Sequence, residues 1–234
     1  YTFVSPVATS TGDEMIYLKG EGYFRLFPFL TGSHSKDVVE TPEQAYEAAT
    51  QFGRFTHLLH GVDIKKLKVT IPCFHDLTLR YQQFLMALEK GNKERIKEAE
   101  VLIRSLVAHA EIVTEYGNII VNPEFKLRVT HHDTKISNVL FDKDGKGLCV
   151  IDLDTVMPGY FISDVGDMMR TYLSPVSEEE KELEKIEVRD EFYKAIVEGY
   201  YNEMKEELTE TEKKYFFYAG TFMIYMQALR FLTD

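Results

Sequence analysis

The segment from residue 131 to residue 152 gathers the residue types with the clearest chemical potential. His131, Asp133, Lys135 and Asn138 lie close together, and Asp152 follows 14 residues after Asn138. Transfer of a phosphoryl group needs a carboxylate at the attacking hydroxyl, oxygen ligands for Mg²⁺ and a cation near the transferred group. The segment supplies all three, so its spacing predicts phosphoryl transfer.

The elements around this segment indicate how it could act. The hydrophobic period drops to two at Val139–Phe141 and Leu148–Asp152, and the polar, glycine-containing stretch between them is typical of a β-hairpin loop. A short loop before this hairpin would project Asp133 and Lys135 into one cleft, with Asn138 at the start of the hairpin. The returning strand would bring its terminal aspartate to the same Mg²⁺, which prefers hard oxygen ligands and retains several waters.

Helical periodicity dominates most of the remaining chain. Ser, Thr, Asp or Asn caps precede the apolar repeats, and glycines follow several of them. The predicted elements are a hairpin of Met15–Lys19 against Tyr23–Leu30, and helices from the Thr41 cap to Gly61, from the Asp76 cap to Gly91, from the Asn92 cap to Gly117, and over about 164–172, 188–206 and 210–232, the last after a Thr209–Glu212 capping box.

Composition narrows the class of protein. The chain has 234 residues, 44% of them hydrophobic, and a formal net charge of −11. The acidic balance opposes a nucleic-acid partner, since such proteins present clustered basic residues. No apolar stretch is long enough for a membrane span. Cys73 and Cys149 are far apart, which suits a reducing, cytoplasmic location.

The motifs also resemble a known family. The pattern His-x-Asp-x-Lys-x-x-Asn at 131–138, followed by a hairpin and Ile151-Asp152, resembles the catalytic loop and metal-binding aspartate of protein-kinase-like enzymes. The flanking residues resemble the aminoglycoside phosphotransferase superfamily. Within it, residues 132–135, 151–159 and 164–167 are most similar to the N-acetylhexosamine 1-kinases. The resemblance covers most of the chain from Phe24 onward.

The resemblance implies an α+β, protein-kinase-like fold, mostly the helical C-terminal lobe with a small β-hairpin. Residues 1–31 would be the remnant of an N-terminal lobe and hinge, and residues 32–234 the helical catalytic and substrate-binding lobe. We expect a fragment, because such kinases have a glycine-rich loop and a strand lysine upstream of the position of Tyr1 and further residues after Asp234.

Residue roles follow from the same resemblance, position by position. Asp133 would be the catalytic base and Lys135 the contact to the γ-phosphate of ATP. Asn138 and Asp152 would bind Mg²⁺. His131 would be a structural residue that bonds neighbouring backbone.

Further roles are implied outside the catalytic loop. Pro28 and Phe29, in the place of the hinge, would contact adenine. Asp164 would orient the catalytic loop from a helix start. Arg230, within the terminal run of residues 229–234, resembles an arginine that contacts the sugar. Asp154 is assigned to substrate binding together with Arg230. Its alternative roles are a second metal ligand or a hydrogen-bonded scaffold residue.

Three functions remain open at this point. The first is a kinase of the anomeric hydroxyl of an N-acetylhexosamine, a small-molecule sugar. The second is a kinase of another small alcohol, such as choline, homoserine or an aminoglycoside. The third is a catalytically silent nucleotide-binding module. Aminoglycosides are polycations and need many carboxylates in their pocket, whereas a neutral hexosamine needs hydrogen-bonding groups and an arginine. The sequence does not indicate an oligomeric state.

Overall fold

The computed structural model describes residues 1–176 and 180–233, so Asp234, the last residue of the terminal motif, lies outside the described residues. The chain adopts a helix-rich α+β fold, as the sequence predicted. None of the helices in the described part is long and apolar enough to cross a bilayer. The helices are α1 (Pro42–Leu58), α2 (Leu77–Lys90), α3 (Lys93–Glu98), α4 (Glu100–Ala108), α5 (Glu111–Val121), α6 (Phe161–Tyr172), α7 (Asp190–Met204) and α8 (Phe216–Thr233).

Two helix pairs form the core of the body. Helix α1 packs along α7, and α6 packs along α8. Both contacts depend on glycine. A Cβ on Gly199 of α7 would lie 2.5 Å from the carbonyl oxygen of Tyr46, and one on Gly166 of α6 would lie 2.4 Å from the carbonyl oxygen of Ala219. The helices therefore approach more closely than side chains at these positions would permit.

Local capping explains where two helices begin. The Thr41 hydroxyl accepts a hydrogen bond from the Gln44 amide at 3.4 Å, and Asp76 accepts one from the Leu79 amide at 3.0 Å. Both caps lie where the sequence predicted them. Helix α1 ends at Leu58 rather than near Gly61, and the Gln44 side chain accepts from the amide of residue 40 instead of completing the box on residue 41.

The single helix predicted from Asn92 to Gly117 is wrong. Asn92 does cap a helix, but the chain turns at Ala99 and again at residues 109–110, which divides the segment into α3, α4 and α5. Helix α5 then continues through Gly117 to Val121. Its buried face carries Ile112, Tyr116 and Ile119, whereas α4 has no buried residue. Packing of α5 against α2 and α8 therefore sets the breaks, and no local helix-breaking residue does.

Three antiparallel strand pairs complete the fold within residues 1–176 and 180–233. The hairpins β1–β2 and β4–β5 were predicted, although β2 stops six residues before Leu30 and β5 stops two residues before Asp152. The pair β3–β6 was not predicted, because its strands are three residues long and one contains Pro158. The strands are β1 (Ile16–Leu18), β2 (Gly22–Phe24), β3 (Arg128–Thr130), β4 (Val139–Phe141), β5 (Gly147–Val150) and β6 (Met157–Gly159).

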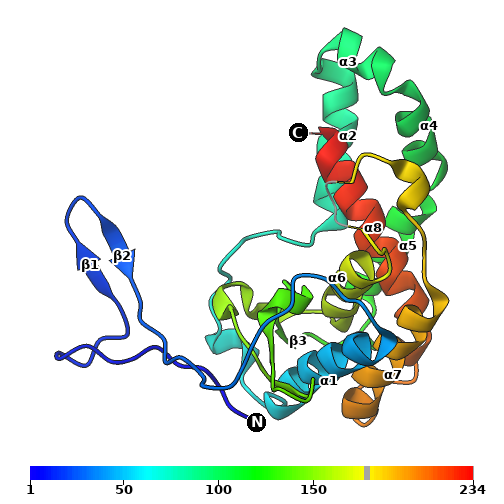
Figure 1. Cartoon of the computed structure of the whole chain (residues 1–234). Coiled ribbons are helices and arrows are strands. Elements are labelled where there is room, and N and C mark those ends of the chain that lie inside the picture. Colours follow the sequence, from blue (N-terminus) through cyan, green and yellow to red (C-terminus); the bar gives the residue numbers. More distant parts are fainter. Residues whose placement is uncertain (177–179, 234) are drawn as a thin grey trace.

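Figure 1 shows how these parts are arranged. The β1–β2 hairpin, in blue, projects away from the helical body, and α3 and α4 lie at the opposite end of that body from α1 and α7. Strand β3 ends directly before His131, and β4 begins directly after Asn138. The short strands thus hold both ends of the catalytic loop.

A buried ion pair connects β3 to the 3₁₀ turn that precedes α8. Arg128, 9% exposed, donates to both carboxylate oxygens of Glu212, which is fully buried, at 2.6 and 2.7 Å. Glu212 also accepts from the amides of Lys126 and Thr209, each at 2.9 Å, and its own amide donates to the Thr209 hydroxyl. The predicted capping box is therefore present, but it begins a short 3₁₀ turn before α8.

We expect Glu212→Gln to lower the free energy of unfolding by about 3–5 kcal/mol, because it leaves the Arg128 guanidinium buried without a counter-charge. Urea denaturation measures the loss. Glu210→Gln is the matched control, since Glu210 forms an exposed ion pair with Lys213 and should cost less than about 1 kcal/mol. Equal losses for the two variants would contradict this assignment.

Candidate active site

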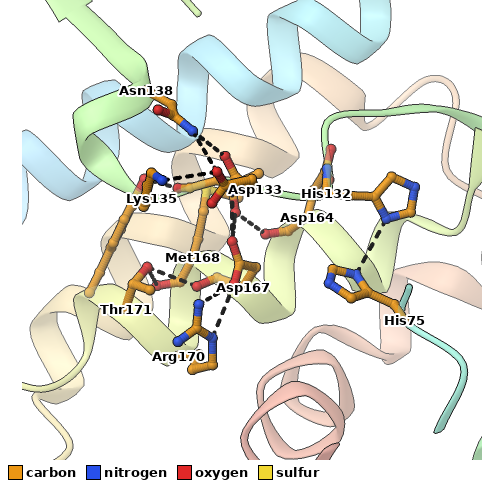
Figure 2. A network of polar contacts seen from close by, with 12 residues as sticks. His75, His132, Asp133, Lys135, Asn138, Asp164, Asp167, Met168, Arg170 and Thr171 are labelled. Carbon is orange, nitrogen blue, oxygen red and sulfur yellow. Dashed lines mark hydrogen bonds and ion pairs between the residues drawn. The ribbon is translucent and has the colours of Figure 1, made fainter. Parts of the chain in front are cut away.

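The catalytic loop, residues 131–135, joins β3 to the 3₁₀ turn that precedes β4. One oxygen of the Asp133 carboxylate, Oδ2, lies 3.1 Å from Lys135 Nζ and 3.0 Å from Asn138 Nδ2. Asn138 Nδ2 also donates to the Asp133 carbonyl at 2.9 Å. Figure 2 shows the three side chains converging. The Asp133 side chain is 26% exposed, so a substrate hydroxyl can reach its carboxylate.

Two aspartates of α6 hold the backbone of this loop. Asp164 accepts from the amides of His131 and His132 at 3.0 and 2.7 Å, and Asp167 accepts from the amide of Thr134 at 2.7 Å. Helix α6 begins at residue 161 rather than near 164, so Asp164 lies within its first turn. The loop is therefore held by carboxylates from a buried helix (Figure 2).

The protonation of these groups depends on their surroundings. Burial raises the pKa of Asp164 to about 7, although the two backbone amides that it accepts from act in the opposite direction. Burial lowers the pKa of Lys135, but its ion pair with Asp133 outweighs this effect and raises the pKa above the ordinary value. Lys135 therefore carries its charge at neutral pH, beside the carboxylate that would face the substrate.

His131 connects the loop to the β4–β5 hairpin. Its Nε2 lies 2.9 Å from the carbonyl oxygen of Ile151, and its Nδ1 accepts from the Asp133 amide at 3.3 Å. This pattern assigns the proton to Nε2. The ring packs edge-on against Phe52 and Phe55 of α1, and burial lowers its pKa. His131 is thus a neutral ring that bonds the backbone on both sides of the site.

Asp152 lies on the wall of a cavity of about 490 Å³. Pro28 and Phe29 line the same cavity, together with Leu140 and Ile151 of the hairpin. Asp152 has a left-handed backbone, with φ of +60°, and its side chain is exposed. The structure therefore brings the predicted adenine contacts and one predicted metal ligand to one apolar cavity.

Asp154 lines this cavity as well, and it is paired with a residue that the sequence did not indicate. Arg25 Nη2 lies 2.5 Å from the Asp154 carboxylate. This hydrogen bond lowers the pKa of Asp154. No motif marked Arg25, because the pairing joins residues 129 positions apart.

Arg230 lies elsewhere, on an exposed position near the end of α8. It is not among the residues that line the cavity of Asp154, so the structure does not bring the two predicted substrate contacts together there. Arg230 nevertheless acts on the pKa of His75, whose ring touches the catalytic loop.

The residues present fit a magnesium ion held mainly by phosphates and water. Among the described residues, no group of three or more His, Cys, Asp or Glu side chains could hold a metal. Asn138 commits its amide nitrogen to Asp133, and no hydrogen bond to its amide oxygen occurs within the described part of the chain. An amide oxygen and the Asp152 carboxylate suit a cation that keeps most of its own water.

Comparisons with known proteins show the family and the fold of this chain. Residues 4–207 match the model of the phosphotransferase enzyme family. Among solved structures, an aminoglycoside phosphotransferase from Alicyclobacillus acidocaldarius superposes with a TM-score of 0.52 at 13% identity, over 99% of this chain and 77% of that one. A choline kinase from Cryptosporidium parvum superposes with a TM-score of 0.56 at 15% identity, over 94% of this chain and 66% of that one.

The two superpositions show a kinase-like fold, and the match to the family model spans the catalytic loop, the β4–β5 hairpin and α6. The chain belongs to the phosphotransferase enzyme family.

Proposed function

We propose that this phosphotransferase moves the γ-phosphoryl group of ATP to a hydroxyl of a small molecule. The observation that carries the proposal is the Asp133 carboxylate, which is partly exposed and held by Lys135 and Asn138. A carboxylate placed in this way can orient an attacking hydroxyl and receive its proton.

In the proposed reaction, Asp133 and Lys135 would have different roles. The acceptor oxygen forms a bond to the γ-phosphorus, the bond from that phosphorus to the β–γ bridging oxygen breaks, and ADP leaves. The acceptor proton passes to Asp133. Lys135, released from its ion pair with Asp133, offers its charge to the γ-phosphate.

The cavity of about 490 Å³ suits the base of the nucleotide. Its apolar walls come from the segment after β2, with Pro28 and Phe29, and from the hairpin, with Leu140 and Ile151. Mg²⁺ held by Asp152 and the amide oxygen of Asn138 would neutralise the charge of the nucleotide phosphates when bound. The cavity would thus place the base on one side of Asp152 and the phosphates toward Asp133.

For the acceptor, we propose a sugar, the anomeric hydroxyl of an N-acetylhexosamine. The support is the similarity of the runs at 151–159 and 229–234 to hexosamine kinases. Arg230 is exposed near the end of α8, where a ligand could reach it. An anomeric hydroxyl is more acidic than an ordinary alcohol, so an aspartate base can serve it with little tuning. The guanidinium of Arg230 would donate two hydrogen bonds to ring hydroxyls or to the acetamido oxygen.

ADP release by the intact enzyme with N-acetylglucosamine, N-acetylgalactosamine, choline, homoserine and kanamycin tests the acceptor. We expect a hexosamine to give the highest kcat/KM. If kanamycin or choline exceeds both sugars by more than about tenfold, which is roughly 1.4 kcal/mol of transition-state discrimination, the hexosamine assignment fails and phosphoryl transfer stands.

Arg230→Lys should raise the KM for the preferred hexosamine, because a point charge cannot reproduce the two parallel donors of a guanidinium. Arg104→Lys, at an exposed position of α4, is the matched control and should leave KM unchanged. Equal KM values for the two variants would remove Arg230 from the acceptor site.

A further inference from the structure

His132, the residue before Asp133, has an unusual backbone. Its φ of +67° lies in the left-handed region, which is unfavourable for a residue with a Cβ and persists only where contacts hold it. Three hydrogen bonds do so. The amide donates to Asp164 at 2.7 Å, ring Nε2 lies 2.7 Å from Thr130 Oγ1, and ring Nδ1 lies 3.3 Å from Nδ1 of His75.

The hydroxyl of Thr130 fixes the direction of this chain of contacts. Thr130 donates its own proton to the carbonyl of Met157 at 3.0 Å, so its oxygen must accept from the Nε2–H of His132. Nδ1 of a neutral His132 then carries only a lone pair. It follows that the proton between the two rings belongs to Nδ1 of His75.

His75 is fixed from the helical side of the site. Its carbonyl accepts from the Tyr116 hydroxyl of α5 at 3.1 Å, and its ring stacks on Phe74 at 4.4 Å. The next residue, Asp76, caps α2. His75 thus joins α2 and α5 to the catalytic loop, as Figure 2 shows for the two rings.

Both rings are neutral. His75 is 8% exposed and His132 5% exposed, and burial lowers the pKa of each to about 3. The charged groups that act on His75 reinforce this effect: Arg80 on α2, Arg170 on α6 and Arg230 on α8. A neutral pair with one shared proton is the state in which the hydrogen-bond chain is complete.

We propose that His75 is a positioning residue for Asp133. His75 holds the His132 ring, and it thereby holds the left-handed turn that presents the Asp133 carboxylate. This role rests on the proposed function, because it concerns the geometry of the candidate base. It also gives a reason for the contact between His75, which precedes α2 and lies outside the catalytic motif, and His132, the residue before Asp133.

Kinetics of three His75 variants in the intact enzyme separate positioning from packing. His75→Phe keeps a ring and removes the donor, and it should lower kcat roughly 10- to 100-fold, the effect of a small misplacement, with little change in the KM for ATP. His75→Asn restores an N–H at the place of Nδ1 and should recover most of the loss. His60→Phe, at an exposed position, is the control. Equal kcat for the Phe and Asn variants, with equal thermal stability, would overturn the proposal.

A double-mutant cycle tests the route through His132. Glycine adopts φ of +67° without strain, so His132→Gly removes the need for a restraint. In that background His75→Phe should change kcat by less than about twofold. If the two effects instead multiply independently, His75 does not act through His132.

Amide exchange and NMR need no acceptor substrate, so they test the role of His75 independently of the proposed activity. Amide exchange at His132 and Thr134 should be faster in His75→Phe and normal in His75→Asn, because the loop opens locally. NMR of the ring nitrogens should show an Nδ1–H tautomer for His75 and an Nε2–H tautomer for His132. Unchanged exchange, or either ring titrating near the ordinary value of about 6.5, would overturn the inference even in an enzyme whose acceptor is unknown.

Discussion

Asp133→Asn should lower kcat by roughly 10²- to 10⁴-fold, because general-base assistance acts in the transition state. The KM for ATP should stay nearly unchanged, since Asp133 is not among the residues that line the proposed nucleotide cavity. The substitution keeps the size of the side chain and its place between Lys135 and Asn138. Steady-state ADP release under saturating ATP and acceptor measures the loss.

Asp144→Asn is the control for this experiment, because Asp144 is an exposed aspartate in the turn of the β4–β5 hairpin. It should retain wild-type turnover. Thermal denaturation of both variants shows whether the loop stays folded. A kcat for Asp133→Asn within about threefold of wild type would remove general-base catalysis by this residue.

Asp152→Asn should impair the engagement of Mg·ATP itself. Of the two predicted metal ligands, Asp152 is the one with a carboxylate, and its side chain is exposed. The neutral amide oxygen of Asn138, the other ligand, cannot replace this charge. We expect the Mg²⁺ concentration for half-maximal activity to rise by at least roughly tenfold, with a fall in kcat. The measurement is a Mg²⁺ titration of ADP release at fixed ATP.

Asp133→Asn and Asp152→Asn should differ in their dependence on Mg²⁺. Loss of a metal ligand should shift the Mg²⁺ dependence, whereas loss of the base should leave it in place. The same Asp144→Asn variant controls for removing a negative charge from the hairpin. An unchanged Mg²⁺ dependence in Asp152→Asn would show that Asp152 does not bind the metal.

The catalytic loop could be predicted from the sequence because its residues act within short stretches. Asp133, Lys135 and Asn138 lie within six residues of each other, and one hairpin returns the chain to Asp152. The helix caps at Thr41 and Asp76 were equally accessible, since a cap is a local contact. Local motifs and caps of this kind can be recognised in a sequence without knowledge of the tertiary structure.

Contacts between distant segments could not be predicted in this way. The β3–β6 pair has too few residues to show a period, and the pairing of Arg25 with Asp154 joins segments with no shared motif. The contact of His75 with His132 spans 57 positions. Each depends on how the helices pack, which also sets the breaks between α3, α4 and α5.

Transfer of a radioactive label from [γ-³²P]ATP tests the central claim most directly. The intact protein is incubated with Mg²⁺, labelled ATP and each candidate acceptor, and the products are separated by charge. The account predicts that label appears in an organic phosphate ester of at least one small alcohol, and that Asp133→Asn abolishes this product. Label that stays in ATP, or leaves only as inorganic phosphate, with every acceptor would contradict it.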